Sequence, residues 1–148
     1  MVDNEKKRNK TWNEKVIIVK NSIERAKTNE NFIQKFYENL FFLNPKLKSY
    51  FKNTNWKQQQ IALTKAIDHM VGFFLDDKND IHHKNLVRIG ESHSKKNINI
   101  HPHVYYYWID AMIMTLSELD HKWVDSYQFY VRESLFFPVS FIISLYHK

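Results

Sequence analysis

The sequence contains no cysteine among its 148 residues. Disulfide bonds, zinc–thiolate sites and thiol nucleophiles are therefore excluded, and nothing ties the chain to an oxidising compartment. The first ten residues are rich in charge and lack the apolar stretch of a secretory signal peptide. We therefore expect a cytoplasmic protein.

Glycine and proline are also scarce, with two and three residues, whereas 43% of the chain is hydrophobic and 16% aromatic. Few helix breakers and many long side chains favour α-helices. A chain of this length can bury roughly two-thirds of its unfolded surface in one core. We expect an all-α domain over residues 13–148, after an extension of residues 1–12 that lacks apolar periodicity and is predicted to be disordered.

Long hydrophobic runs are missing as well. The longest apolar stretch covers residues 134–146 and contains Pro138. It is too short to cross ~30 Å of hydrocarbon, so it is predicted to be a buried helix, and no membrane association is expected.

The formal net charge is +6, which raises the possibility of an acidic partner such as nucleic acid. The lysines, however, are scattered singly or in short pairs, and no predicted helix carries a basic stripe with exposed aromatic residues between its charges. This pattern is typical of a solvated surface, so nucleic-acid binding is not expected.

Apolar residues recur at helical spacing from Trp12 onwards. The expected inner face of the first helix is Val16, Ile17, Val19, Ile23 and Ala26. Thr28 or Asn29 is the expected N-cap of a second helix, which should stop near Asn44 because Pro45 disfavours helical backbone in the residue before it.

The rest of the chain repeats this alternation of helical stripes and polar breaks. Residues 53–55 supply N-cap chemistry for a long helix, and residues 76–80 are an expected loop. The remaining helices are expected at 46–51, from 56 to 74, up to His93, from Pro102 to Leu119, and from Trp123 to Ile142.

His93 shares a helical stripe with Leu86, Ile89 and Gly90, which points it to the interior. A single histidine on an apolar face is more often a core residue satisfied by hydrogen bonds than a ligand. Its interpretation therefore depends on the motifs around it. These are Phe36-Tyr37-x-x-Leu40-Phe41-x-x-Asn44-Pro45, Phe51-x-x-Thr54-Asn55-Trp56-x-x-Gln59-x-x-x-Leu63, Leu86-x-x-Ile89-Gly90-x-x-His93 and Ile100-x-Pro102-x-x-Tyr105-x-x-Trp108.

In order, spacing and residue type, these motifs together resemble the bacterial single-domain globins over about residues 15–145. The resemblance implies a globin fold, in which helices cross at ~50° around a haem pocket, with a short or absent D helix. It also implies haem b as the cofactor.

The resemblance assigns His93 as the ligand of the haem iron. One axial imidazole leaves the sixth coordination position free for a diatomic gas, and its second ring N–H needs an acceptor, for which Ser92 and the Ile89 carbonyl are both candidates. The cofactor-binding residues implied by the resemblance are Phe51, Leu63, Ile89, His93, Ile100 and Tyr105.

On the gas side of the iron, the resemblance places Tyr37 and Gln59 as hydrogen-bond donors and Leu63 as the roof. Donors in an apolar cavity stabilise a gas ligand that takes up negative charge. Gln58 and Gln60 are alternatives to Gln59, which we prefer because it lies four residues before Leu63.

Tyr105 matches a tyrosine that approaches the proximal histidine in flavohaemoglobin-like globins, whose last helix also carries a glutamate. Residues 134–148 contain no carboxylate, so the chain departs from that pattern. Tyr105 is then mainly an aromatic core residue with a hydroxyl to satisfy.

The other histidines do not predict a metal site. His82-His83 and His101-x-His103 are adjacent or alternate pairs, which do not face together on a helix, and are expected to be exposed. His69 faces away from Gln59 and is a poor candidate for a second axial ligand.

Reversible binding of dioxygen, or of CO or NO, is the function these features favour, with roles in oxygen transport or storage. The alternatives are nitric oxide dioxygenation with a separate reductase, because two isolated glycines cannot supply a dinucleotide-binding loop, or gas sensing through a partner protein. A further alternative is a helical scaffold without a cofactor that binds protein or nucleic acid through its basic surface. A monomer or a homodimer is expected, since residues 105–108 are four consecutive aromatics that cannot all face inward.

Overall fold

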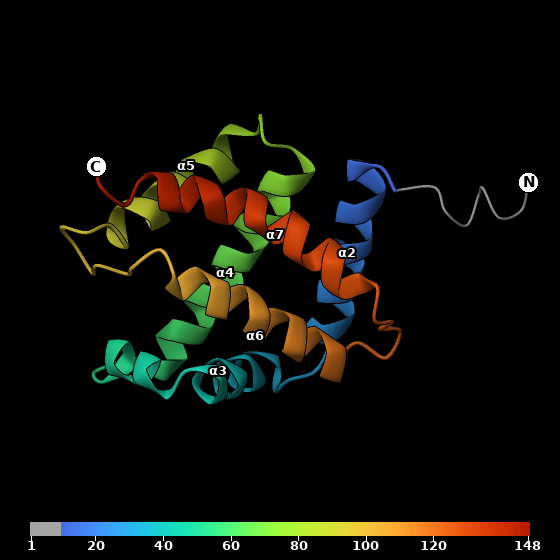
Figure 1. Cartoon of the computed structure of the whole chain (residues 1–148), viewed down its shortest axis with the longest axis horizontal. Helices are drawn as coiled ribbons and strands as arrows, with labels where there is room; N and C mark the ends of the chain where they lie inside the picture. The colour runs from blue at the N-terminus through green and yellow to red at the C-terminus, as the bar shows by residue number, and fades with distance from the viewer. Residues whose placement is uncertain (1–9) are drawn as a thin grey trace, which may run out of the picture.

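The computed structural model describes residues 10–148 and contains seven helices in that range, with no strand. Their bounds are α2 Trp12–Lys27, α3 Phe32–Leu43, the 3₁₀ helix η1 Pro45–Phe51, α4 Trp56–Leu75, α5 Asp80–Ser92, α6 Val104–Leu119 and α7 Tyr127–Ser144. Figure 1 shows α2 at one end of the long axis and the C-terminus at the other, with α6 and α7 running across the molecule between them. The predicted all-α class is confirmed.

Side-chain caps set several of the helix starts. Thr11 and Glu14 form a reciprocal capping box at the start of α2. Asn55 Oδ1 accepts a hydrogen bond from the backbone N–H of Gln58 at the start of α4, and Asn79 caps α5 in the same way. Most of the predicted disordered extension lies outside the described residues, but Thr11 and Trp12, its last two residues, are the N-cap and first residue of α2.

The chain between α3 and α4 is short. Asn44 is extended, as expected before a proline, and Pro45 opens η1, which ends at Phe51. No helix lies in the four residues between η1 and α4. This connection agrees with the expected short or absent D helix.

Three helix starts differ from the sequence prediction. Helix α3 has Asn31 as its N-cap, while Asn29 Oδ1 accepts from the Asn31 backbone N–H in the turn before it. Helix α6 begins at Val104, not Pro102, and Trp123 lies before α7. None of these three helices has a side-chain hydrogen bond at its N-cap, although Asn31 and Ser126 are of residue types that often cap helices.

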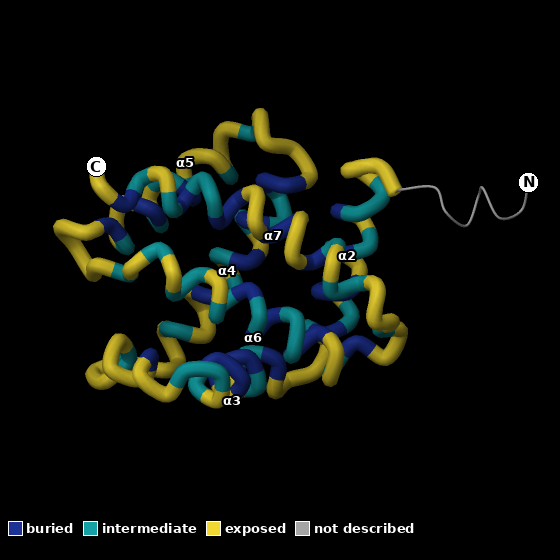
Figure 2. Tube along the Cα trace, in the orientation of Figure 1, coloured by how far each residue is buried: buried dark blue, intermediate teal, exposed yellow. Residues whose placement is uncertain are grey.

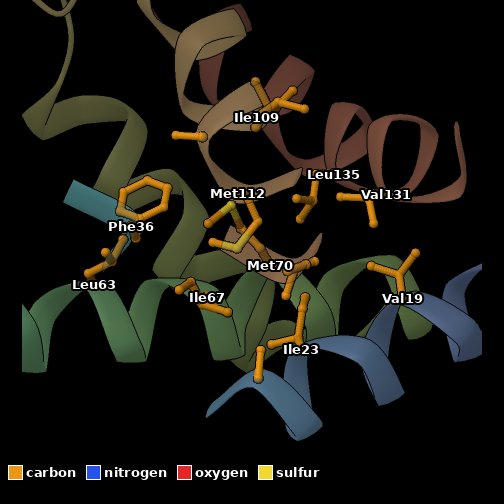
Figure 3. Packing of buried hydrophobic residues seen from close by; sticks show 14 of the residues in the cluster. Val19, Ile23, Phe36, Leu63, Ile67, Met70, Ile109, Met112, Val131 and Leu135 are labelled. Carbon is orange, nitrogen blue, oxygen red and sulfur yellow. The ribbon is translucent and has the colours of Figure 1, made fainter. Parts of the chain in front are cut away.

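Helix α3 packs along α6, α2 along α7, and α4 against both α5 and α7. Figure 2 shows the buried residues on the inward sides of these helices and the exposed residues on their outer sides and in the connections. Figure 3 shows side chains of α2, α3, α4, α6 and α7 meeting in one core. Its labelled residues are Val19, Ile23, Phe36, Leu63, Ile67, Met70, Ile109, Met112, Val131 and Leu135. Ile17, predicted to face this core, is 50% exposed.

None of the described helices is both long and apolar enough to span a bilayer.

Asp120 forms an ion pair with Arg25, and the Asp120 side chain is buried. Asp120, 4% exposed, accepts from Arg25 Nε at 2.6 Å, from Arg25 Nη2 at 2.9 Å and from Ser22 Oγ at 2.7 Å. Burial raises the pKa of Asp120, but the hydrogen bonds from Arg25 and Ser22 outweigh it and lower the pKa to about 2. The carboxylate therefore ties the end of α6 to α2.

Because the folded-state pKa of Asp120 lies below its unfolded value of about 4, the group stabilises the fold above about pH 4 and loses that contribution as the pH falls toward 2. We expect Asp120→Ala to lower the free energy of unfolding at pH 7 by about 3 kcal/mol, since it leaves Arg25 without its partner. Denaturant titration followed by circular dichroism measures this loss. Asp110→Ala, which removes an exposed ion pair between α6 and Arg132 of α7, should cost below about 1 kcal/mol. Equal losses in the two variants would contradict the assigned role of Asp120.

Candidate functional site

A cavity of about 480 Å³ lies between α3, η1, α4, α5, α6 and α7. All the residues that the sequence assigned to the site line this cavity. They are Tyr37, Phe51, Gln59, Leu63, Ile89, His93, Ile100 and Tyr105. The fold thus brings together side chains from five helices and the segment after α5.

The cavity walls are mostly hydrocarbon and aromatic side chains. Leu63 and Met70 of α4 belong both to the cavity wall and to the core, so the cavity is continuous with the core packing (Figure 3). The exposed residues that line it form its mouth. They are Tyr50, Ala62, Arg88, Ser92 and Ile98.

His93 is the C-cap of α5, and its ring is fixed through one nitrogen. Nδ1 lies 2.7 Å from the Ile89 carbonyl oxygen and 3.0 Å from Ser92 Oγ, and the Ser92 hydroxyl donates to the same carbonyl at 2.9 Å. Both acceptors considered from the sequence are therefore engaged. Because Nδ1 donates to the carbonyl, a neutral ring carries its lone pair on Nε2.

Nε2 of His93 has no hydrogen-bond partner among residues 10–148. Burial lowers the pKa of His93, against a smaller opposing effect of the Ile89 hydrogen bond. The ring is therefore neutral at pH 7, with a free nitrogen lone pair at the cavity wall.

Another part of the wall carries a polar pair. Gln59 Nε2 donates to Tyr37 Oη at 2.7 Å, which leaves the phenolic hydrogen free to donate elsewhere. Burial raises the pKa of Tyr37 to about 12, although the hydrogen bond from Gln59 acts in the lower direction. Gln58 and Gln60 are exposed and do not line the cavity.

Aromatic rings hold Tyr37 in place. Its ring meets Phe51 edge-on at a centroid distance of 5.3 Å and Trp56 at 5.1 Å, while Phe51 and Trp56 stack at 5.7 Å. Such pairs stabilise beyond the area they bury. Trp56 belongs to one of the sequence motifs but had no predicted role. In the structure it is connected to the site through its ring contacts with Tyr37 and Phe51.

Tyr105 of α6 lines the cavity, and burial strongly raises its pKa. Its hydroxyl has no hydrogen-bond partner among the described residues. Helix α7 contributes Val139 and Ile142 to the wall, both apolar.

Several other residues that were not predicted from the sequence also line the cavity. Met70 lies on the same stripe as Leu63 and could have been assigned by helical spacing, as could Trp108 and Ile142. Arg88, at the mouth, carried no signal, because an arginine on a helix looks like any solvated surface residue.

The other histidines form pairs that spacing did not predict. His69 Nδ1 lies 3.1 Å from His82 Nδ1, and both side chains are partly buried, so the expectation that His82 is exposed was wrong. His101 and His103 do face each other, with 2.6 Å between their Nδ1 atoms. They precede α6 in a turn, where the helical rule for alternate residues does not apply.

Comparison with known proteins identifies the fold. A Pseudomonas aeruginosa protein, whose crystal structure is described as structurally highly homologous to a human haemoglobin, superimposes with a TM-score of 0.81. It is 22% identical, and the match covers 93% of this chain and 100% of that one. No model of a protein family matches the sequence, and no curated protein matches it. The predicted globin-like fold is therefore confirmed as a fold.

The raised pKa of Tyr37 is testable by spectrophotometric titration of the phenols near 295 nm. The difference between the native chain and Tyr37→Phe should show one phenol titrating near pH 12, well above the ordinary value of 10. Gln59→Leu removes the donor that favours the phenolate and should move this transition to higher pH. Loss of a transition at pH 10 in Tyr37→Phe would contradict the burial of this group.

Proposed function

We propose that this protein holds haem b in the cavity, with His93 as the iron ligand, and reversibly binds dioxygen or another diatomic gas. The observation that carries the proposal is the state of His93: a neutral imidazole, fixed through Nδ1, with its Nε2 lone pair unused at the wall of an apolar cavity. A haemoglobin-like fold supports the same conclusion.

The cavity suits this cofactor in size and lining. Its volume of about 480 Å³ lies within the ~300–1,000 Å³ typical of sites for small molecules and cofactors. A porphyrin presents a broad apolar face and two carboxylates at one edge. Apolar side chains line the interior, whereas Arg88 and Ser92, a cation and a hydroxyl, lie at the mouth.

The residues that line the cavity would have distinct roles in binding the haem. His93 would hold the iron through Nε2, because the Ile89 carbonyl and Ser92 already fix Nδ1 and the plane of the ring. Haem iron held by one histidine supplies a vacant coordination position at which a diatomic gas can bind reversibly. Phe51, Leu63, Ile89, Ile100 and Tyr105 would pack against the ring and exclude water from it.

Tyr37 and Gln59 would make the polar contact to the gas. Gln59 donates to the Tyr37 oxygen, and this orients the phenolic O–H away from Gln59. With a pKa of about 12, Tyr37 stays a donor throughout the physiological range. A hydrogen bond to a ligand that takes up negative charge is worth about 1.5–3 kcal/mol in such surroundings.

His93→Gly should abolish the specific haem spectrum. The native chain reconstituted with hemin and reduced should show a Soret band that shifts with carbon monoxide, and the variant should not. Imidazole added to the variant should restore the band, because the freed space can hold the missing ring. His103→Gly, which removes an exposed histidine, is the matched control. A native spectrum in His93→Gly without imidazole would overturn the ligand assignment.

Tyr37→Phe should retain haem but release dioxygen faster. Loss of about 1.5–3 kcal/mol of stabilisation corresponds to a dissociation rate about 10- to 150-fold higher, measured by stopped-flow displacement with carbon monoxide. Gln59→Leu should have a smaller effect of the same sign, since it removes the partner that orients the hydroxyl. An unchanged rate in Tyr37→Phe would exclude this residue as a donor to the gas.

A further inference from the structure

A second histidine site lies outside the cavity, between α4 and α5. His69 of α4 and His82 of α5 place their Nδ1 atoms 3.1 Å apart, with ring centroids 5.4 Å apart and an angle of 58° between the ring planes. Both side chains are partly buried. The two residues belong to different helices, so the packing of α4 on α5 sets their separation.

Gly72 leaves the space beside α4 that the His82 ring occupies. A Cβ atom at residue 72 would lie 2.2 Å from His82 Nε2 and 2.4 Å from its Cε1, which shows that the ring rests against the bare backbone of α4. The Nε2 side of the ring is thereby covered by Gly72. Nδ1 is the nitrogen presented to His69.

Two ring nitrogens 3.1 Å apart repel each other through their lone pairs unless a proton or a metal ion lies between them. In the metal-free protein one ring donates an N–H to the lone pair of the other. A metal ion held by two imidazoles at ~2.0–2.1 Å, with a bond angle between about 90° and the tetrahedral value, needs nitrogens ~2.9–3.4 Å apart. The 3.1 Å separation lies within that range, whereas the 2.6 Å between His101 and His103 does not.

We propose that His69 and His82 form a bidentate site for a divalent ion of the imidazole-binding class, such as Zn²⁺, Ni²⁺ or Cu²⁺, which joins α4 to α5. Water completes the coordination, because no cluster of three or more metal-ligating side chains occurs in the described part of the chain. When the ion binds, the ring that carried the Nδ1–H shifts to its Nε2–H tautomer, so both neutral rings offer an Nδ1 lone pair to the ion and no proton is lost from the pair.

The charged residues around the two histidines limit the affinity of the site for a metal cation. Asp68 is the acidic group that acts on His69, but its carboxylate accepts from Lys27 Nζ at 2.7 Å, while Lys65 and Arg88 add positive charge. Burial and the proximity of His82 lower the pKa of His69, so its ring is neutral at pH 7. We therefore expect weaker binding than at a structural site with four ligands, but binding that depends on both rings.

The test is calorimetric titration of the full chain with ZnCl₂ at pH 7. We expect one site in the native chain, and a loss of affinity of about tenfold or more in His69→Asn and in His82→Asn, since each variant keeps only one ligand. Zinc should raise the Tm of the native chain and of neither variant. His83→Asn is the matched control: His83 is adjacent in sequence but packs against Phe141, so its variant should bind zinc as the native chain does.

Gly72→Ala tests the geometry with both imidazoles still present. The added methyl occupies the space of the His82 ring, so zinc affinity should fall although no ligand is removed. Circular dichroism in the presence of EDTA establishes that each variant is folded. Native zinc affinity in both His69→Asn and His82→Asn would overturn the proposal, as would loss of the site in His101→Asn.

Discussion

The hydrogen bond from His93 Nδ1 to the Ile89 carbonyl decides which nitrogen of this ring is available to the cavity. The same carbonyl, in the last turn of α5, also accepts the backbone N–H of His93 at 3.0 Å and the Ser92 hydroxyl at 2.9 Å, so the backbone and the ring of His93 converge on one oxygen. The chain then folds back along the same helix end. Ile98 N–H donates to the Ser92 carbonyl and Ile100 N–H to that of His93, which brings both isoleucines to the cavity wall. The end of one helix thus positions a potential ligand and part of the surface around it.

The helices were largely predictable because their inner faces repeat at helical spacing, as in α4 from Leu63 to Phe74. Where asparagine side chains cap the backbone, at Asn55 and Asn79, the starts agree with N-cap chemistry. Helices α3, α6 and α7 begin in aromatic or turn segments without a side-chain cap, and there the predicted starts were wrong by a few residues.

For the candidate site, the lining residues were predictable from the sequence, but the contacts between separate helices were not. Eight residues assigned by resemblance to the globins line one cavity, because residues at these spacings come together when the helices pack in a globin-like fold. The pairing of His69 with His82 and the stacking of Trp56 on Phe51 depend on how separate elements meet. Spacing along one helix carries no information about such contacts, so only the tertiary structure reveals them.

Both glycines of the chain lie inside helices, where glycine is less favourable than alanine by roughly 0.5–1 kcal/mol. Each gives a neighbour room at the backbone: Gly72 for His82 of α5, and Gly90 of α5 for Leu145, whose Cδ1 would lie 2.5 Å from an added Cβ. Helix α5 is therefore seated close to its neighbours near both of its ends. A substitution that adds a side chain at either glycine therefore requires a matching change in the residue that rests on it, His82 or Leu145.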